Sequence, residues 1–493
     1  MSWGRAVLGL VAVVAAGALL VSGGSDVDPE TPVGLAGMPP PFLGVAVLGE
    51  GGLTAAVDAY GNVVDLRAPG PAGRALIENS AERQAAGTVP ADTGIQVWVR
   101  LEDGQARPMW QADEVRQRYL PETNVLRTVA RFGTRRIRIE EAIHGDELAV
   151  VVDGGGSAVQ LRVNTAGGAV TESRHVIDEA AASDRRWLKR SLALGGGAPA
   201  WAKEMYERSL LVLHALTDRR AGAVAAGARD GWAFAWPRDA AAVAIAFTAA
   251  GYQPEAERVT RFLLGLRLQA VARFNGDGSP VPGRGPQGDA IGWVAAASRA
   301  TSFVDSSGSA RRAAHILAGG GPVPWRDRAD YWEQGAGDYL GNAFAAGEPA
   351  IRHLYGAKLP ARLLRQPAEA DSGLDSAAAW GVRPFPHPAL YPAIRRTLND
   401  LVANGTRFGI TPGEGWAAGE DPWSAPTAWT AWSLAALGER RSALRLLRDL
   451  RRSATAAGML PERVDAETGV PRSTTPLAWS HAFAILALRE LWP

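Results

Sequence analysis

The chain has 493 residues, of which 47% are hydrophobic and 21% are charged, and its formal net charge at pH 7 is +1. A chain of this length exceeds one ordinary hydrophobic core, so two domains are expected. The sequence contains no cysteine, which excludes disulfides, thiolate catalysis and cysteine-ligated metal centres. The near-neutral charge and the scattered arginines offer no basic patch for nucleic acid or for an anionic lipid surface.

The N-terminus, MSWGRAVLGLVAVVAAGALLVSGG, has one basic residue followed by an apolar run from Ala6 to Val21. A run of this length is short for a bilayer span and is typical of a signal peptide. Residues 1–23 are therefore predicted to be a signal peptide, with an uncleaved membrane anchor as the alternative. Either way the protein is expected outside the cytoplasm, secreted or attached to the bacterial cell envelope. Residues 24–41 are rich in proline and glycine and are predicted to be a linker.

Residues 42–172 have the pattern of an antiparallel β-sandwich. The stretch GLTAAVDAYGNVVDLRAPG alternates around a turn at 60–62, and LRTVARFGTRRIRIEEAI forms a second alternating pair around Gly133. Several short strands at hairpin spacing indicate two antiparallel sheets packed on each other.

The period of the hydrophobic pattern changes after about residue 175. Segments such as APAWAKEMYERSLLVLHALTD, SAPTAWTAWSLAALG and RRSALRLLRDLRRSA are amphipathic at helical spacing, with no alternating strand between them. We therefore predict an all-α domain over residues 199–493, joined to the sandwich by a second linker at 173–198.

Cofactor and metal motifs are weak in this sequence. GRGPQG at 283–288 satisfies GxGxxG, but it follows no strand and has a proline where the phosphate-binding turn would lie. The seven histidines are spread singly, with no HExxH spacing among them. We expect neither an organic cofactor nor a metal ion.

Three stretches combine tryptophan with charge. They are DGWAFAWPRDAAAVAIAF at 230–247, DYWEQ around Glu333, and LPERVDAETGVPRSTTPLAWS around Glu462. Sugar rings stack their apolar faces on aromatic side chains, while their hydroxyl groups need charged partners. Two carboxylates from distant parts of the chain are the minimum for glycoside hydrolysis.

These stretches resemble glycoside hydrolase family 15, which contains the glucoamylases, glucodextranases and bacterial-type trehalases. The segment YERSLLVLHALTDRRAGAVAAGARDGWAFAWPRDA is similar to the family's helix, turn and W-x-R-D motif, and DYWEQ is similar to its catalytic-acid segment. LPERVDAETGVPRSTTPLAWSHAFAILAL resembles the catalytic-base segment. PQGDAIGWVAAAS and GEDPW resemble two further family segments, and all five occur in the family's order. The resemblance implies an (α/α)6 toroid of six helical hairpins behind the β-sandwich.

The resemblance also implies roles for individual residues. Glu333 matches the general acid and Glu462 the general base of an inverting enzyme that releases glucose from the non-reducing end of an α-glucoside. Arg238 and Asp239 match the pair that binds the hydroxyl groups of that glucose, with Trp232 and Trp236 as wall and floor. The other substrate-binding positions that it implies are Trp332, Gln334, Trp416 and Trp423.

The local sequence offers a reason for each of the two carboxylate roles. Glu333 lies beside Tyr331 and Trp332, a setting that raises the pKa of a carboxyl group. Glu462 precedes Arg463, whose charge favours the ionised form that a base needs. The alternative interpretation of Glu333 is a helix-start glutamate paired with Arg326 or Arg328. For Arg238 and Asp239 it is a capping arrangement at a helix start.

The chain also departs from the family pattern. Gly283 stands where the family has a tryptophan, Thr411 where it has a substrate-binding arginine, and Gln334 where it has a second glutamate. Two alternatives therefore remain open. One is a glycoside phosphorylase on the same fold, in which phosphate replaces the base-activated water. The other is a non-catalytic envelope protein that binds carbohydrate.

Overall fold

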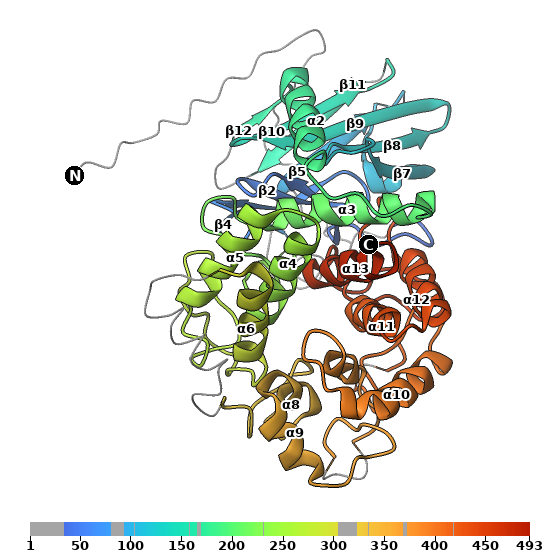
Figure 1. Cartoon of the computed structure of the whole chain (residues 1–493). Helices are drawn as coiled ribbons and strands as arrows, with labels where there is room; N and C mark the ends of the chain where they lie inside the picture. The colour runs from blue at the N-terminus through green and yellow to red at the C-terminus, as the bar shows by residue number, and fades with distance from the viewer. Residues whose placement is uncertain are drawn as a thin grey trace, which may run out of the picture.

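The computed structural model describes residues 34–493, apart from residues 80–92, 103, 157, 165–168, 230, 304–322, 334, 368–371 and 418. Strands occupy the described chain up to Thr171, and helices follow from Arg174 onward. Figure 1 shows the strands in the upper part of the molecule and most of the helices below them. The predicted order, a β part followed by a helical part, is confirmed. The apolar run at 6–21 lies outside the described residues, and no helix within them is long and apolar enough to cross a membrane.

Two sheets make up the β part. The strands of the first sheet are β1 (Gly44–Gly49), β2 (Thr54–Asp58), β3 (Val63–Ala68), β4 (Arg74–Glu78), β5 (Gly94–Arg100), β6 (Ala106–Pro108) and β11 (Ala158–Asn164). Those of the second are β7 (Glu114–Tyr119), β8 (Leu126–Phe132), β9 (Arg135–His144), β10 (Glu147–Asp153) and β12 (Ala169–Thr171). A short 3-10 turn, η1 (Met109–Gln111), precedes β7. The order is β1-β2-β3-β5-β11 in the first sheet, with β4 on β3 and β6 on β5, and β12-β10-β9-β8-β7 in the second.

The strand sequences explain why the sheets pack on each other. In β8, alternate side chains are buried and the others are more exposed, as a strand with one buried face requires. The same face of the neighbouring strand β7 meets the first sheet, since the Tyr119 hydroxyl donates to the carbonyl of Val47 at 2.7 Å and Gln117 Nε2 donates to the carbonyl of Asp58 at 2.8 Å.

One strand pair differs from the predicted antiparallel pattern. β12 runs parallel to β10, with Glu147 opposite Ala169. The preceding strand, β11, belongs to the other sheet, so β12 is not the return strand of a hairpin and nothing requires it to be antiparallel.

The segment 173–198, predicted as a linker, contains the helix α2 (Arg174–Leu188). Its residues Val176, Ile177, Ala180 and Ala181 pack against Val125, Ala142 and Ala149 on the outer face of the second sheet. These four residues form one narrow stripe at helical spacing between charged residues, and small alanines carry half of it. That stripe is too weak a sequence signal for a helix, although it suffices to cover a sheet face.

The helical part contains α3 (Ala200–Leu216), α4 (Pro237–Ala249), α5 (Gln253–Gly265), α6 (Ala290–Thr301), α8 (Leu340–Ala346), α9 (Glu348–Tyr355), α10 (Tyr391–Ala403), α11 (Ser424–Ala436), α12 (Arg440–Ser453) and α13 (Ala478–Leu491). Two 3-10 helices, η2 (Ser376–Gly381) and η3 (Pro388–Leu390), lie between α9 and α10.

Six of these elements close into an inner ring. Each packs on the next in the order α4, α6, α8, η2, α11 and α13, and α13 packs back on α4. Outside them, α3 packs on α13, α5 on α4, α9 on α8, α10 on η2, and α12 on α11 (Figure 1).

Composition separates inner from outer helices. The inner α11, SAPTAWTAWSLAA, is buried on every side from Ser424 to Leu434, so the prediction that this segment is amphipathic is wrong. The outer α12, RRSALRLLRDLRRS, buries one face and exposes its arginines. A helix that is apolar all round needs neighbours all round, whereas an amphipathic helix needs one neighbour and water.

The β part is attached directly to the helical part. The amide of Arg219 donates to the carbonyl of Gly51 at 2.9 Å. A Cβ atom at Gly51 would lie 2.1 Å from the carbonyl oxygen of Thr217, so this close approach requires glycine. A second contact joins the amide of Gly276 to the carbonyl of Ala72 at 3.0 Å, and it holds the loop between α5 and α6, which leads to the candidate site.

Candidate active site

The candidate residues lie in the segments that lead into the inner elements. Trp232 and Trp236 precede α4, Glu333 precedes α8, and Glu462 precedes α13. The segments contact one another, since Tyr331 donates its hydroxyl to Asp375 Oδ1 at 2.7 Å just before η2. The ring therefore brings residues that are far apart in the sequence to one place.

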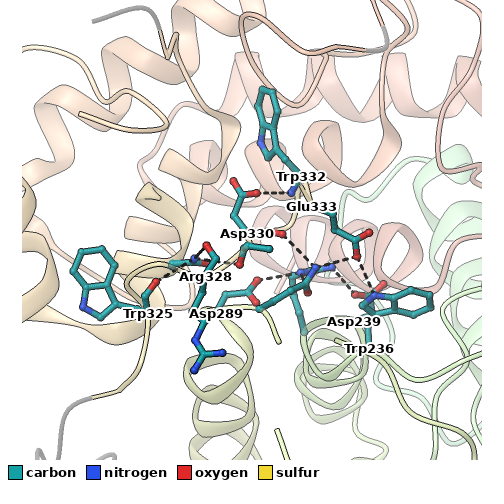
Figure 2. Close-up of polar contacts among 12 residues, drawn as sticks. Trp236, Asp239, Asp289, Trp325, Arg328, Asp330, Trp332 and Glu333 are labelled. Carbon is teal, nitrogen blue, oxygen red and sulfur yellow. Dashed lines mark hydrogen bonds and ion pairs between the residues drawn. The ribbon is translucent and has the colours of Figure 1, made fainter. Parts of the chain in front are cut away.

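The segment 231–239 links both carboxylates that the sequence singled out. The indole Nε1 of Trp232 donates to Glu462 Oε1 at 3.3 Å. The indole Nε1 of Trp236 donates to Glu333 Oε1 at 3.4 Å (Figure 2). The two tryptophans thus contact the acids themselves through their indole N–H groups.

Arg238 and Asp239 follow in the first turn of α4 and are both buried. Arg238 Nη2 lies 3.3 Å from Asp239 Oδ2, and its Nη1 lies 3.1 Å from Asp289 Oδ2 and donates to Gln287 Oε1 at 2.7 Å. One guanidinium group thus balances two carboxylates, and the Arg238 side chain also lies 4.5 Å over the ring of Trp479.

In Asp239, burial opposes the ionised form of the carboxyl group and the neighbouring Arg238 favours it. Burial raises its pKa to about 7 against the opposing effect of Arg238, and the charges of Asp289 and Glu462 raise it further. Within the described residues, its Oδ2 is buried with no hydrogen-bond donor of good geometry. A buried oxygen of this kind is costly unless a ligand supplies a donor.

Glu333 has an unusual backbone. Its φ is +56°, in the left-handed region that costs a residue with a side chain about 1 kcal/mol or more. The turn is held because the Glu333 amide donates to the carbonyl of Asp330 at 3.1 Å, while Asp330 Oδ1 accepts from the Trp332 amide at 3.0 Å (Figure 2).

The carboxylate of Glu333 has three partners. Its Oε1 accepts from Gln287 Nε2 at 3.0 Å as well as from Trp236, and its Oε2 is paired with the guanidinium of Arg284. The proposed alternative partners were Arg326 or Arg328, but Arg326 pairs with Asp338 at 3.0 Å. Figure 2 shows Trp332 extending away from the Glu333 carboxylate. The prediction that Tyr331 and Trp332 form its setting is therefore wrong, because neighbours in the sequence turn to other partners.

Glu462 is held by neutral donors and by its own backbone. Its Oε1 accepts from Trp232 and its Oε2 from the hydroxyl of Ser473. Its amide donates to the carbonyl of Thr474 at 2.8 Å, and its carbonyl accepts from the amide of Ser424 at 3.1 Å. The segment is thus fixed between two neighbouring chain segments.

The electrostatic setting of Glu462 differs from the prediction. Burial raises its pKa, and the hydrogen bonds from Ser473 and Trp232 and the charge of Arg463 oppose this only in part. Arg463 points its charge at Asp421, with Nη1 3.6 Å from Asp421 Oδ2. Arg463 does favour the ionised form of Glu462, as expected, but desolvation outweighs it and the pKa is raised.

Trp332, Trp416 and Trp423 form one aromatic wall. Adjacent rings meet edge to face, with centroids 4.8 Å apart for Trp332 and Trp416 and 5.2 Å apart for Trp416 and Trp423. The guanidinium of Arg365 lies 4.8 Å over the ring of Trp332, so that ring is partly covered. Gln334 lies outside the described residues.

Two of the three departures from the family pattern, at Thr411 and Gly283, lie in the described residues and have simple structural descriptions. Thr411 donates its hydroxyl to the carbonyl of Gly413 at 3.3 Å, so it contributes to its own turn. Gly283 has a φ of +94°, which a tryptophan would adopt only with strain.

Sequence reasoning missed several residues that the structure places at the site: Arg284, Gln287, Asp289 and Ser473. Gln287 connects Arg238 to Glu333, and Asp289 is fully buried beside Arg238. The signal for both was the PQGDA segment, since a glutamine and an aspartate two residues apart before a helix both face the site. Arg284 and Ser473 have no comparable signal.

In the described part of the chain, no group of three or more histidine, aspartate and glutamate side chains is arranged to hold a metal ion. The site is a set of carboxylates, arginines and indoles. Chemically, such a set can bind hydroxyl groups and exchange protons.

Comparison with solved structures shows that this is the fold of glucoamylases and related glycosidases. A bacterial glucoamylase, solved in complex with acarbose, superposes with a TM-score of 0.68 at 13% identity and covers 96% of each chain. A wild-type glycosidase has a TM-score of 0.51 at 21% identity and covers 60% of this chain and 99% of its own. A glycosidase variant solved in complex with glucose has a TM-score of 0.50 at 20% identity with the same coverage. No family model and no curated protein matches the chain.

Proposed function

We propose that this protein is an inverting glycoside hydrolase that releases glucose from the non-reducing end of an α-glucoside. Its helical part would be an (α/α)6 toroid of six hairpins, as the closed ring of inner elements and the likeness to a bacterial glucoamylase support. The glucoamylase bound acarbose and the related glycosidase variant bound glucose, which agrees with a carbohydrate substrate.

One observation carries this proposal. The short segment 231–239 donates an indole N–H to each of two carboxylates and, within the next turn, presents a buried arginine and aspartate. A structural ion pair alone gives no reason for two separate acids to converge on one segment. Hydrolysis of a glycoside does require two acids beside a site for sugar hydroxyl groups.

In the proposed mechanism Glu333 is the general acid and Glu462 the general base. Glu333 would give its proton to the glycosidic oxygen as the bond to the anomeric carbon breaks. Glu462 would take a proton from a water molecule that attacks that carbon from the opposite face, so the configuration inverts. Asp239 and Arg238 would bind the glucose hydroxyl groups through Asp239 Oδ2 and the guanidinium donors.

The experiment is the stereochemistry of the first product. Proton NMR of an α-glucoside digest should show β-glucose in the first minutes, before mutarotation. α-Glucose as first product would contradict the inverting mechanism. Turnover that requires added phosphate and yields glucose 1-phosphate would identify a phosphorylase, and sugar binding without turnover would identify the non-catalytic alternative.

We also propose that residues 1–23 export the protein from the bacterial cytoplasm. The apolar run from Ala6 to Val21, with one preceding arginine, supports this. Mass spectrometry of the expressed full chain should find a cleaved N-terminus in the extracytoplasmic fraction. Intact protein in the cytoplasm would contradict export.

A further inference from the structure

Arg284 lies in the loop between α5 and α6, with Gly283 and Gly285 on either side. Its side chain is 44% exposed and is paired with Glu333 Oε2, and its guanidinium lies 5.9 Å from the ring centroid of Trp236. A Cβ atom built at Gly283 or at Gly285 would meet no described atom within 4 Å. The backbone on either side of Arg284 therefore borders open space.

The pairing constrains which oxygen of Glu333 can carry a proton. Oε1 accepts two N–H donors, from Trp236 and Gln287, so it stays the acceptor oxygen. The proton of a general acid must then sit on Oε2, which Arg284 holds. A guanidinium has donors only and cannot accept from an O–H group. The charge of Arg284 favours the carboxylate form of Glu333, so Glu333 acts more readily as an acid once Arg284 has separated from it.

The separated guanidinium would lack a counter-ion. In the described part of the chain, Glu333 is the carboxylate paired with Arg284, whereas Arg463 is paired with Asp421. Asp239 and Asp289, two further acids of this region, are already shared by Arg238. An anionic group on the substrate would supply a counter-ion for the separated guanidinium.

The geometry also indicates where that charge would lie on the substrate. Oε1 of Glu333 faces Gln287, and Gln287 in turn contacts Arg238, where the glucose would bind. Arg284 is paired with the other oxygen of the carboxylate, Oε2. A group that draws Arg284 away would thus belong to the sugar beyond the scissile bond.

Building on the proposed function, we propose that Arg284 selects substrates whose leaving-group sugar carries an oxyanion, a carboxylate or a phosphate. The oxyanion takes over the guanidinium through paired N–H donors, a geometry for which arginine is suited. Glu333 Oε2 then takes a proton from solvent and passes it to the glycosidic oxygen. Neutral α-glucosides leave Arg284 on Glu333 and are poorer substrates.

The test compares three disaccharides that differ only at C6 of the reducing sugar: maltose, α-1,4-glucosyl-glucuronate, and maltose phosphorylated at C6 of the reducing glucose. The α-1,3-linked series provides the same comparison for a second linkage. The wild-type enzyme should cleave a charged disaccharide with kcat/KM about 10-fold or more above the neutral one. Preference for the glucuronate or for the phosphate identifies which oxyanion is used.

Arg284→Gln should abolish this preference. Its kcat/KM on the charged disaccharide should fall about 10-fold or more, while cleavage of neutral maltose should become faster, because the guanidinium no longer favours the carboxylate form of Glu333. The upper limb of its pH–rate profile on maltose should move to higher pH, because Glu333 then keeps its proton without competition from the guanidinium. The matched control is Arg395→Gln, an arginine 46% exposed and paired with Glu439 at 3.0 Å far from the site, which should change neither.

Two results would overturn the proposal: a wild-type enzyme that cleaves maltose at least as well as both charged analogues, or equal losses on all three substrates in Arg284→Gln. If no disaccharide and no α-glucosyl fluoride is cleaved, the hydrolase function itself fails. Calorimetric affinities of the same disaccharides for the wild type and Arg284→Gln then decide. An oxyanion preference lost with Arg284 supports the role of Arg284, and equal affinities overturn it.

Discussion

The segment that carries Glu333 and the segment that carries Glu462 differ in backbone and in charge. Glu333 sits at a strained turn with φ of +56°, its side chain is 28% exposed, and it faces a cation. Glu462 is anchored through both its amide and its carbonyl, is desolvated, and accepts hydrogen bonds from a neutral indole and a neutral hydroxyl.

This difference runs against the proposed roles in the free protein. A cation on Glu333 favours the carboxylate, although an acid must hold a proton, and burial raises the pKa of Glu462, although a base must lose one. The roles therefore depend on what the substrate does. In our proposal a sugar that fills the site removes water from Glu333, and an oxyanion on the leaving-group sugar takes Arg284 from it, whereas the Glu462 segment keeps its backbone contacts.

The largest expected effects come from replacing the two acids, and they decide which acid does which job. Glu333→Gln should reduce cleavage of a disaccharide by about 10²–10⁴-fold. It should largely spare α-glucosyl fluoride, since fluoride leaves with little protonic help. Glu462→Ala should depress both substrates, because both need an activated water.

Initial rates on the two substrates, measured side by side, check this pattern. Equal losses on both substrates for Glu333→Gln would show that Glu333 is not the acid. A Glu462→Ala enzyme that loses disaccharide cleavage and keeps fluoride cleavage would exchange the two roles, as the electrostatics of the free protein alone would suggest.

Much of the fold could be predicted from the sequence because it rests on local periodicity. The alternation in LRTVARF is strand β8, and the apolar runs before and after Trp429 and Phe483 are inner helices. Trp429 and His481 are both buried in this inner layer. The short stripe of α2 and the parallel pairing of β12 could not be predicted, since both depend on surfaces supplied by other strands.

The residues of the candidate site could be predicted from the sequence, but their electrostatic surroundings could not. The resemblance placed Trp232, Trp236, Arg238, Asp239, Glu333 and Glu462, and the structure brings them together. Their electrostatics could not be predicted from neighbours in the chain. Tyr331 turns to Asp375, Arg463 turns to Asp421, and the cation on Glu333 comes from a separate loop.

The next largest effect is expected at Asp239, which is paired with Arg238 and is influenced by the charge of Glu462. Asp239→Asn removes a charged acceptor for sugar hydroxyl groups at nearly constant volume. A hydrogen bond to a charged group contributes about 1.5–3 kcal/mol, so kcat/KM should fall about 10-fold or more. Steady-state kinetics beside the thermal midpoint test this.

The stability of the same variant has a definite sign with pH. Burial raises the pKa of Asp239 to about 7 in the folded protein, above the usual value of 3.8. The wild type therefore loses stability through this group as the pH rises from about 4 to 7. Asp239→Asn should lose less over that range, and the thermal midpoint at pH 4 and pH 8 measures it. A variant that unfolds, with full activity in its folded fraction, would make the pair a structural cap.

A smaller effect is expected when one indole donor is removed from each acid. Trp232→Phe leaves Glu462 with the Ser473 hydroxyl as its side-chain donor. The pKa of Glu462, already raised, should rise further, so the lower limb of the pH profile of kcat/KM should move to higher pH. Trp236→Phe should move the upper limb instead, through Glu333. Each donor lies at 3.3 or 3.4 Å, a long hydrogen bond, so kcat should fall only about 3- to 10-fold. Two pH–rate profiles test the pair, and a shift of the same limb in both variants would contradict separate roles.

The smallest effect is expected at Arg463, although it is the nearest charged residue in the sequence to Glu462. Its charge lowers the pKa of Glu462. However, its Nη1 also lies 3.6 Å from Asp421 Oδ2, and its side chain is 31% exposed to water, which screens the charge. Arg463→Gln should therefore move the lower limb slightly to higher pH and change kcat at neutral pH by less than about 2-fold. Arg284→Gln, a replacement of the other arginine beside an acid, moves the opposite limb. A larger shift of the lower limb in Arg463→Gln than in Trp232→Phe would contradict this prediction. The ionisation of Glu462 would then be set by a charge from its own loop rather than by burial, and the contrast between the Glu333 and Glu462 segments would no longer hold for Glu462.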